Sequence, residues 1–441
     1  MWVRACLLAG VIATVFGCGR WGLTYNLEEQ LGPDAAPIPE YDNTWTVTIQ
    51  EERQEGGETI TSPEDLPDGT EGLSFGEAIV IACNTPGTDE IIFDPAAFPQ
   101  GSQIILTAAL PPIDCDGLLI DGRDASVVIS APAPTGSLFT ITGSNVTVRN
   151  LEFFDTASDV FVVGAAGTRL ENLTFGAAAS AAMVVEDSAG TRITNPTIRN
   201  GVANGITVIR GTDIVIDEAT ITDVGGNSVA VIDSNQVELN NSRIERAGSE
   251  LVRFQSSSAV TVNNNFMVVQ NKTTQVGLFF LEVEDSLITK NIVDPGDSHM
   301  IRLTDSTGNT IERNIIDGGE AGIVLEGLST GNLLFANAVY QATLDGLYFS
   351  STSTGNTAVH NTLLNCTSPI VDSSGVTTLG NNLISTDPAD FVDPLPPTYD
   401  FTLAAGSLHI DAGTDLGYDC VPDEPESFLG LAPDLGAVET Q

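Results

Sequence analysis

The chain has little positive charge. Among its 441 residues there are 16 Lys plus Arg against 59 Asp plus Glu, so its formal net charge is −43. Binding to nucleic acid or to anionic lipid needs a basic face, and the composition therefore excludes both as main partners. An acidic surface suits calcium, which prefers oxygen ligands, although the sequence has no EF-hand loop. The simpler interpretation is the solvated surface of a secreted protein.

Long apolar runs are also missing. The longest, from Leu7 to Phe16, is too short to span a membrane as a mature helix and follows Arg4, as in an export signal. It leads into Gly17-Cys18, which resembles the end of a bacterial lipobox, in which the cysteine is lipidated. We therefore expect a lipoprotein signal peptide over residues 1–17 and a flexible tether over residues 18–44. Cys18 would then anchor an exported protein to a membrane.

Cysteine is scarce, with 6 in the chain, and no Cys-x-x-Cys spacing occurs, which argues against a zinc site. Four cysteines lie in the body of the protein, where export permits disulfides. Four cysteines allow three pairings. Proximity in sequence favours Cys83 with Cys115 and Cys366 with Cys420, one pair near each end of the body.

What the chain has in abundance is repetition. Between about residue 146 and residue 385, two apolar positions five residues apart recur about every 23 residues. The first series is Val148, Leu170, Ile193, Ile216, Leu239, Val262, Ile288, Ile311, Leu334, Ala358, Leu379, and the second is Phe153, Phe175, Ile198, Ile221, Ile244, Met267, Val293, Ile316, Val339, Leu363, Ile384. A third apolar pair follows in many repeats. Each repeat therefore has three short strands, which bury an apolar face only when stacked on their neighbours.

The local patterns favour strands. Apolar and polar residues alternate, as in residues 146–148 and 260–262, and the gaps are rich in Gly, Asn, Asp and Ser. The sequence predicts an all-β protein, a right-handed parallel β-helix of about thirteen three-strand coils. Asparagine recurs at one turn, which predicts a structural ladder of amide hydrogen bonds more than a ligand site. After Asn264 these asparagines move by one residue relative to the apolar positions, so their register stays open.

The open ends of a solenoid need covers. Ser74 and Glu77 have the spacing of a capping box, and they predict a short helix over residues 74–82. We expect an N-terminal cap with the first coils over residues 45–117, the repeats over residues 118–386, and an irregular C-terminal cap over residues 387–441.

Both ends carry further motifs. After Ser74 and Glu77 come Gly87-x-Asp89-x-Ile91-x-Phe93, then Ile105-Leu106-Thr107, Leu110-Pro111 and Ile120-Asp121-Gly122, and residues 403–413 and 433–439 close the chain. This order resembles bacterial right-handed parallel β-helix proteins of the pectin-lyase-like superfamily. The chain departs at Leu73 and Gly76, where those proteins have Cys and Arg. The resemblance implies the fold and an extracytoplasmic location, and it implies little about activity because the fold hosts lyases, hydrolases, adhesins and binding modules.

The enzymes of that superfamily act on acidic polysaccharides. Lyases use an Arg or Lys base, often with calcium, and hydrolases use clustered Asp residues and a Gly-His-Gly segment, which this chain lacks. Lys290 and Arg313 fall at equivalent positions of neighbouring repeats, so they should lie roughly 5 Å apart along the axis. They resemble the base and acid of such lyases, but their place at a turn favours ordinary solvated residues.

The outward face of the third strand is the second candidate. Its expected polar residues are Arg253, Gln255, Glu282, Arg302, Thr304, Glu326, Tyr348 and Ser350, alternating with core positions Phe254, Leu281, Leu303, Leu325 and Phe349. One repeat is three residues longer and contains Lys272, which could overhang Arg253 and Arg302. Such a column suits carbohydrate binding, and it equally suits an exposed strand face with ion pairs between coils.

Three functions remain open. The first is a monomeric, membrane-tethered lipoprotein that binds polysaccharide or another cell-surface partner and needs no cofactor. The second is a polysaccharide lyase or hydrolase, with calcium as a candidate cofactor and Arg253, Lys290, Arg302 and Arg313 as candidate catalytic residues. The third is a structural surface element. The shortage of basic residues and the lack of a complete catalytic set favour the first.

Overall fold

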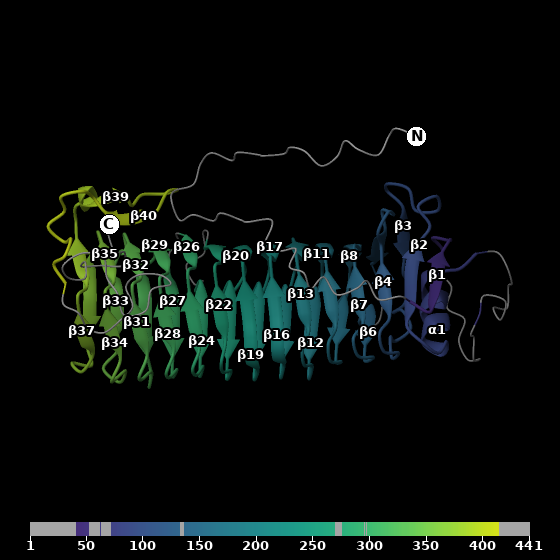
Figure 1. Cartoon of the computed structure of the whole chain (residues 1–441), viewed down its shortest axis with the longest axis horizontal. Coiled ribbons are helices and arrows are strands. Elements are labelled where there is room, and N and C mark those ends of the chain that lie inside the picture. The colour runs from purple at the N-terminus through teal and green to yellow at the C-terminus, as the bar shows by residue number, and fades with distance from the viewer. Residues whose placement is uncertain are drawn as a thin grey trace, which may run out of the picture.

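A computed structural model of the chain describes residues 41–52, 62, 72–132, 136–269, 276–294, 296 and 298–413. The chain winds into a long solenoid with three walls, which are parallel sheets of 14, 13 and 11 strands. Figure 1 shows these strands stacked along the long axis, with the helix α1 (Phe75–Asn84) at the N-terminal end. The predicted all-β parallel β-helix is confirmed.

The first sheet contains β1 (Asn43–Val47), β2 (Asp89–Phe93), β4 (Leu119–Asp121), β7 (Thr147–Arg149), β10 (Arg169–Glu171), β13 (Arg192–Thr194), β16 (Thr212–Asp217), β19 (Asn235–Asn240), β22 (Thr261–Asn263), β25 (Leu287–Thr289), β28 (Thr310–Glu312), β31 (Leu333–Phe335), β34 (Thr357–Val359) and β37 (Thr378–Gly380). The second sheet contains β3 (Gln103–Ile105), β5 (Val128–Ala131), β8 (Glu152–Thr156), β11 (Thr174–Ala178), β14 (Thr197–Arg199), β17 (Thr220–Val224), β20 (Arg243–Ala247), β23 (Phe266–Val268), β26 (Ile292–Asp294), β29 (Ile315–Asp317), β32 (Ala338–Tyr340), β35 (Thr362–Leu364) and β38 (Leu383–Ser385). The third sheet contains β6 (Phe139–Ile141), β9 (Phe161–Val163), β12 (Met183–Glu186), β15 (Ile206–Ile209), β18 (Val229–Ile232), β21 (Val252–Gln255), β24 (Leu278–Leu281), β27 (His299–Thr304), β30 (Ala321–Glu326), β33 (Asp345–Phe349) and β36 (Ser368–Asp372).

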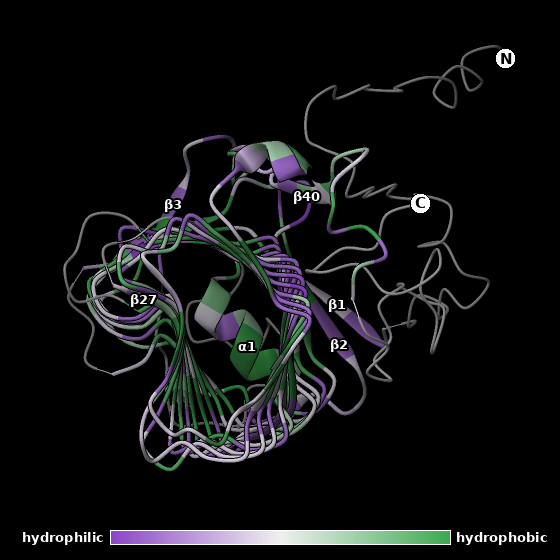
Figure 2. Ribbon diagram, turned by 90° about the vertical axis from the view of Figure 1, so that its left-hand side faces the viewer, coloured by the Kyte–Doolittle hydropathy of each residue, from purple (hydrophilic) through white to green (hydrophobic). Residues whose placement is uncertain are grey.

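The core lies inside the coils. The two apolar series sit at equivalent positions of neighbouring strands, because Leu170 pairs with Val148 and Phe175 pairs with Phe153. Like residues therefore stack, and the rings of Phe153 and Phe175 lie 5.1 Å apart at an angle of 15°. Figure 2 looks along the axis and shows the apolar residues lining the interior. Each coil buries its apolar residues against the next, which is why single repeats could not fold alone.

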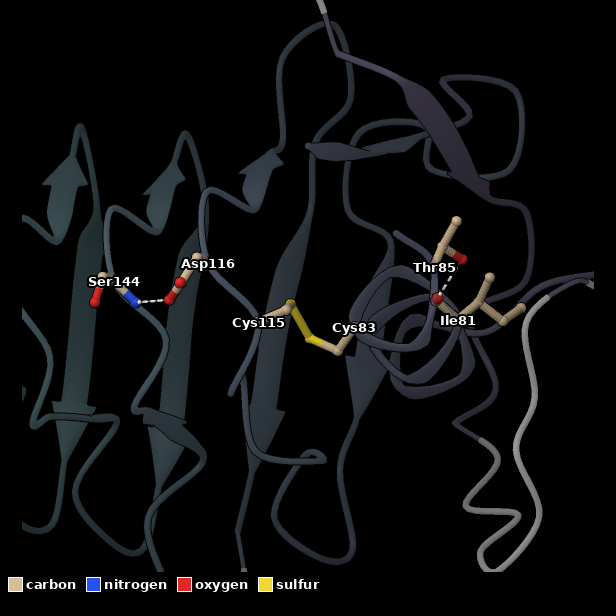
Figure 3. Close-up of a disulfide and its surroundings, with 6 residues drawn as sticks. All are labelled: Ile81, Cys83, Thr85, Cys115, Asp116 and Ser144. Atoms are coloured by element: carbon tan, nitrogen blue, oxygen red, sulfur yellow. Dashed lines mark hydrogen bonds between the residues drawn. A yellow bond between two sulfur atoms is a disulfide. The ribbon is translucent and has the colours of Figure 1, made fainter. Parts of the chain in front are cut away.

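The helix α1 covers the N-terminal end of this core. The side chain of Ser74 accepts from the backbone N–H of Glu77, and the Glu77 carboxylate accepts from that of Ser74, so the predicted capping box is present. Figure 3 shows the disulfide that joins Cys83, near the end of the helix, to Cys115 in the first coils. This is the pairing that sequence proximity favoured, and it ties the cap to the solenoid.

The asparagines form two ladders instead of one. The outer ladder lies on the turn between the first and second sheets in left-handed backbone, which asparagine tolerates better than most residues. Its members are Asn150, Asn172, Asn195, Asn241 and Asn264. The inner ladder begins one residue later and is almost fully buried except at its last member. Its members are Asn265, Asn291, Asn314, Asn337, Asn361 and the half-buried Asn382. The one-residue step in the sequence is thus a change of ladder, not a change of strand register.

Each inner amide bonds to the next coil. Asn314 donates from Nδ2 to Asn337 Oδ1 over 3.0 Å and to the Ile288 carbonyl over 2.9 Å, while its own Oδ1 accepts from the backbone N–H and the amide of Asn291. Asn309, Asn332 and Asn356 repeat this arrangement at the corner between the third and first sheets. These amides satisfy turn backbone groups that have no water to bond.

A short antiparallel hairpin folds back over the outside of the second sheet. It follows a 3₁₀ helix (Pro388–Asp390) and consists of β39 (Phe391–Asp393) and β40 (Asp400–Leu403). Figure 2 shows it outside the coils, and Figure 1 places it at the C-terminal end of the solenoid. Phe391, Tyr399, Phe401 and Leu403 pack on the outward residues Ile315, Ala338, Tyr340, Leu364 and Leu383. We call this segment, residues 387–404, the C-terminal hairpin.

The last coil corrects part of the predicted core. Leu379 and Ile384 belong to the two apolar series, yet they are 47% and 53% exposed because no described coil follows them. Cys366 is buried and forms no disulfide with any described residue, and its predicted partner Cys420 lies outside the described residues. Within the described ranges, no helix is both long and apolar enough to cross a membrane.

Candidate functional site

The outward side chains of five neighbouring strands of the third sheet form two rows along the solenoid axis. The first row is Arg253, Phe279, Arg302, Val324 and Tyr348, and the second is Gln255, Leu281, Thr304 and Glu326. We call these nine residues the third-sheet face. The residues between them, such as Phe254, Phe280 and Leu303, point inward and are fully buried. Alternation along each strand therefore fixes which side chains point outward, although Val324 is covered by its neighbours and only 2% exposed.

The centre of the face is an aromatic ring between two arginines. The guanidinium carbon of Arg253 lies 5.2 Å from the Phe279 ring centroid, and that of Arg302 lies 5.4 Å from it. Both distances are within the range of cation–π attraction. Because the three residues come from consecutive strands of one sheet, the backbone holds this Arg–Phe–Arg stack in place before any ligand arrives.

Polar partners orient both arginines. Arg253 donates from Nη2 to Gln255 Oε1 over 3.0 Å and lies 3.8 Å from the Glu250 carboxylate. Arg302 donates from Nε to Glu326 Oε1 over 2.9 Å, and Thr304 donates to the same oxygen over 2.9 Å. Two positive groups are thus matched by two carboxylates, so the face is close to neutral although the whole chain carries −43.

His299 opens β27 at the edge of the face. It pairs across the sheet with Ala321, which pairs in turn with Asp345. Burial lowers the pKa of His299, and the charge of Arg302 lowers it further, while Glu320, Glu326 and Asp345 act in the opposite direction. Its Nδ1 atom is buried and has no hydrogen-bond partner among the described residues. At neutral pH this side chain is therefore an uncharged imidazole.

The structure corrects one part of the sequence prediction. Leu281 was expected in the core with Glu282 on the face, but Phe254 pairs with Phe280, so Phe280 is the core residue and Leu281 faces outward. Glu282 follows the strand in left-handed backbone, is exposed and accepts from Ser256 Oγ. The longer repeat shifts the pairing by three residues, from 23 to 26, whereas the expected assignment of Leu281 opposite Phe254 placed the third strand one residue too far along. Phe279, at the centre of the face, was missed for the same reason.

Lys290 and Arg313 lie elsewhere. They occupy the turn positions of the outer asparagine ladder on neighbouring coils, between the first and second sheets. Arg313 lies 3.4 Å from the Glu312 carboxylate and 5.8 Å from the Phe335 ring. The structure therefore brings these two residues near each other but not near Arg253 and Arg302. Lys272 and Cys18 lie outside the described residues.

No three His, Cys, Asp or Glu side chains converge to hold a metal ion within the ranges that the structure covers. The expectation of calcium stays a prediction.

Known proteins share the sequence pattern and the fold of this chain. The family described as the right-handed beta helix region matches residues 136–273 and 204–363, which together span more than half of the chain. The chain belongs to the right-handed β-helix family. No curated protein matches it significantly.

Solved structures agree on the fold. One is DFA-IIIase from Arthrobacter chlorophenolicus in complex with GF2, with 14% identity, 76% of this chain and 98% of that chain covered, and a TM-score of 0.58. Another is the catalytic domain of a GH87 α-1,3-glucanase in complex with tetrasaccharides, with 13% identity, 73% and 70% coverage, and a TM-score of 0.53. A third is the Dettilon tailspike protein, with 13% identity, 75% and 69% coverage, and a TM-score of 0.51. At these identities the likeness shows the fold alone.

Proposed function

We propose that this β-helix protein binds an extended polysaccharide along the third-sheet face. The observation that carries the proposal is the Arg253–Phe279–Arg302 stack, held between Gln255 and Glu326 on one rigid sheet. A fixed set of donors beside apolar surface loses little conformational freedom on binding, which favours affinity for a ligand as flexible as a sugar chain.

The chemistry of the face matches that of sugars. A sugar ring presents C–H groups on its flat faces and hydroxyl groups around its rim. Tyr348, Phe279 and Leu281 offer apolar or aromatic contact area, while Arg302, Gln255 and Thr304 offer hydrogen-bonding groups beside it. Neighbouring coils are roughly 4.8 Å apart, close to the advance of one sugar in an extended 1,4-linked chain. A chain lying parallel to the axis would meet one strand per sugar.

The structural neighbours support the class of ligand. The glucanase domain was solved in complex with tetrasaccharides, and DFA-IIIase in complex with GF2. We extend only this class, and not their reactions, to the present chain. The proposal also includes export and a lipid on Cys18, as the N-terminal sequence predicts, and membrane fractionation of the Cys18→Ser variant tests that part.

The test is binding of the purified protein to a panel of neutral and acidic polysaccharides. We expect at least one polysaccharide to bind, and the Arg302→Ala and Tyr348→Ala variants to bind it at least tenfold more weakly, since each removes about 1.4 kcal/mol or more. Arg192→Ala is the matched control, because the side chains of Arg192 and Arg302 are both 33% exposed and both ion-paired. Equal affinity in all four proteins, or binding to no polysaccharide, would refute the proposal.

Turnover is the second candidate function. It is favoured by the neutral imidazole of His299, which lies near the carboxylates of Glu320, Glu326 and Asp345. The same panel measures it through reducing ends, for hydrolysis, and through unsaturated uronide absorbance with and without calcium, for a lyase. Product formation that survives in Arg192→Ala and is lost in His299→Ala would establish this function at the same face, and its absence would leave binding alone.

A further inference from the structure

A cluster of three oxygen groups lies beneath the C-terminal hairpin. The hydroxyl of Tyr399 is 2.8 Å from Asp294 Oδ1 and 2.8 Å from Asp317 Oδ2. The two carboxyl groups come from corresponding positions of β26 and β29 on neighbouring coils, because the residues before them, Val293 and Ile316, are paired. Tyr399 comes from the hairpin, so the cluster connects the hairpin to the solenoid wall.

The cluster needs an extra proton. A phenol has one proton and can donate to only one carboxylate. The second contact, equally short, requires the other carboxyl group to be protonated and to donate to the tyrosine oxygen. With both carboxylates ionised, one of them would face the lone pairs of the hydroxyl oxygen and the charge of its neighbour.

No neighbouring positive charge in the described part of the chain takes the place of this proton. Among the described residues, no Lys, Arg or His forms an ion pair with Asp294 or Asp317. Tyr340 of β32 is another titratable group beside Asp317, and burial raises the pKa of Tyr340. On the hairpin side, Asp393 and Asp400 are acidic, and Asp390 is engaged by Ser385 and by His409 at 3.6 Å. Burial raises the pKa of Asp317, the hydrogen bond from Tyr399 acts in the opposite direction, and the neighbouring Asp294 raises it further, so that it lies above its usual value.

We propose that Asp294, Asp317 and Tyr399 form a proton-dependent latch that holds the C-terminal hairpin on the second sheet at low pH and loosens as the pH rises. The closed state binds one proton more tightly than the open state, in which both carboxyl groups return to water. The stabilisation is therefore fully present below the ordinary pKa of Asp, about 3.9, and is lost as the pH rises through the higher pKa of the closed cluster. Opening would uncover the apolar side chains of Ile315 and Ala338.

Hydrogen exchange of the hairpin amides tests the latch. The amide of Ala404, which donates to the Asp390 carbonyl over 2.8 Å, reports on hairpin opening. In the Asp317→Asn variant the side-chain amide donates to the tyrosine oxygen without titrating, so the hairpin should stay closed at every pH. We compare exchange of the unmodified chain with that of the variant at the same pH, which cancels the intrinsic pH dependence and that of the His409–Asp390 pair.

The quantity compared is the exchange rate of the Ala404 amide in the unmodified chain divided by its rate in Asp317→Asn. We expect this ratio to be near one at about pH 4 and to rise by up to tenfold for each pH unit until the closed cluster titrates. Asp294→Asn must behave like Asp317→Asn, so the test survives if one variant fails to fold. Asp393→Asn, which removes an exposed hairpin carboxylate outside the cluster, must behave like the unmodified chain. A ratio that stays constant between about pH 4 and pH 8, or an equal effect of Asp393→Asn, would overturn the latch.

Discussion

Removal of one inner-ladder amide should destabilise the middle of the solenoid strongly. In Asn314→Ala, the backbone N–H of Asn291 loses its acceptor and the Ile288 carbonyl loses a donor, while both groups stay in a ladder that is almost fully buried. An unsatisfied buried backbone group costs about 1–3 kcal/mol. The Asn291 N–H is one such group, whereas the Ile288 carbonyl lies in the paired strand β25, so we expect a loss of roughly 1–3 kcal/mol in local stability. The ladder should thus act as a structural support, not as a ligand site.

The outer ladder supplies the control. Asn195 donates one exposed hydrogen bond to Asn172 and lies in left-handed backbone, which glycine adopts without strain. Asn195→Gly should cost less than about 1 kcal/mol. Hydrogen exchange of the Ile292 and Ile315 amides, which flank the inner ladder, measures the difference. If Asn314→Ala exchanged no faster at these amides than Asn195→Gly, the assignment of structural energy to the inner ladder would be wrong.

Two further predictions concern the N-terminal cap. Burial raises the pKa of Glu52, whose carboxylate accepts from the Gly76 backbone, from 4.5 to about 8. The folded state holds this proton more tightly than the unfolded state. The unfolding free energy of the chain relative to that of Glu52→Gln should therefore fall between about pH 5 and pH 8, by at most about 1.4 kcal/mol per pH unit. Urea unfolding measures this difference, and a difference that stays constant with pH would contradict the raised pKa. The Cys83–Cys115 disulfide closes a segment of 32 residues, so Cys83→Ser with Cys115→Ser should lower unfolding free energy by about 3–4 kcal/mol, and an unchanged urea midpoint would show that the cap is held by packing alone.

Repetition made most of the fold predictable from the sequence. Positions such as Val148 and Phe153 recur with a fixed spacing, and stacked coils leave only one way to bury them together. The N-terminal helix was equally predictable, since its capping box joins Ser74 and Glu77, which are only three residues apart. The capping box and the repeat period are both visible in the local sequence, so neither prediction needed a contact between distant residues.

Three features depended on contacts that the sequence does not show. The step after Asn264 is a transfer from an exposed turn position to a buried one, and both positions accept asparagine. Phe279 and Leu281 face outward because the inserted residues lie before β24, so its pairing follows the longer spacing throughout. Tyr399 meets Asp317 and Asp294 across 82 and 105 residues of sequence, and only the return of the hairpin onto the second sheet creates that contact.

The third-sheet face illustrates both cases. Arg253, Arg302, Glu326 and Tyr348 were found because they alternate with core residues, which is a local signal. The partner that organises them, Phe279, was not found because its direction depends on the register of an irregular repeat. The Lys290–Arg313 pair was placed on neighbouring coils correctly, but its position at the opposite corner from the face required the three-dimensional fold.

The central claim is that a polysaccharide lies along the axis on the third-sheet face. The most direct measurement is calorimetric titration with oligosaccharides of increasing length, taken from the polysaccharide that binds in the panel. The account predicts that affinity rises with each added sugar until the ligand spans the five strands from β21 to β33, and that Arg302→Ala reduces this gain while Arg192→Ala does not. Affinity that is independent of length, or that Arg302→Ala leaves unchanged, would contradict it.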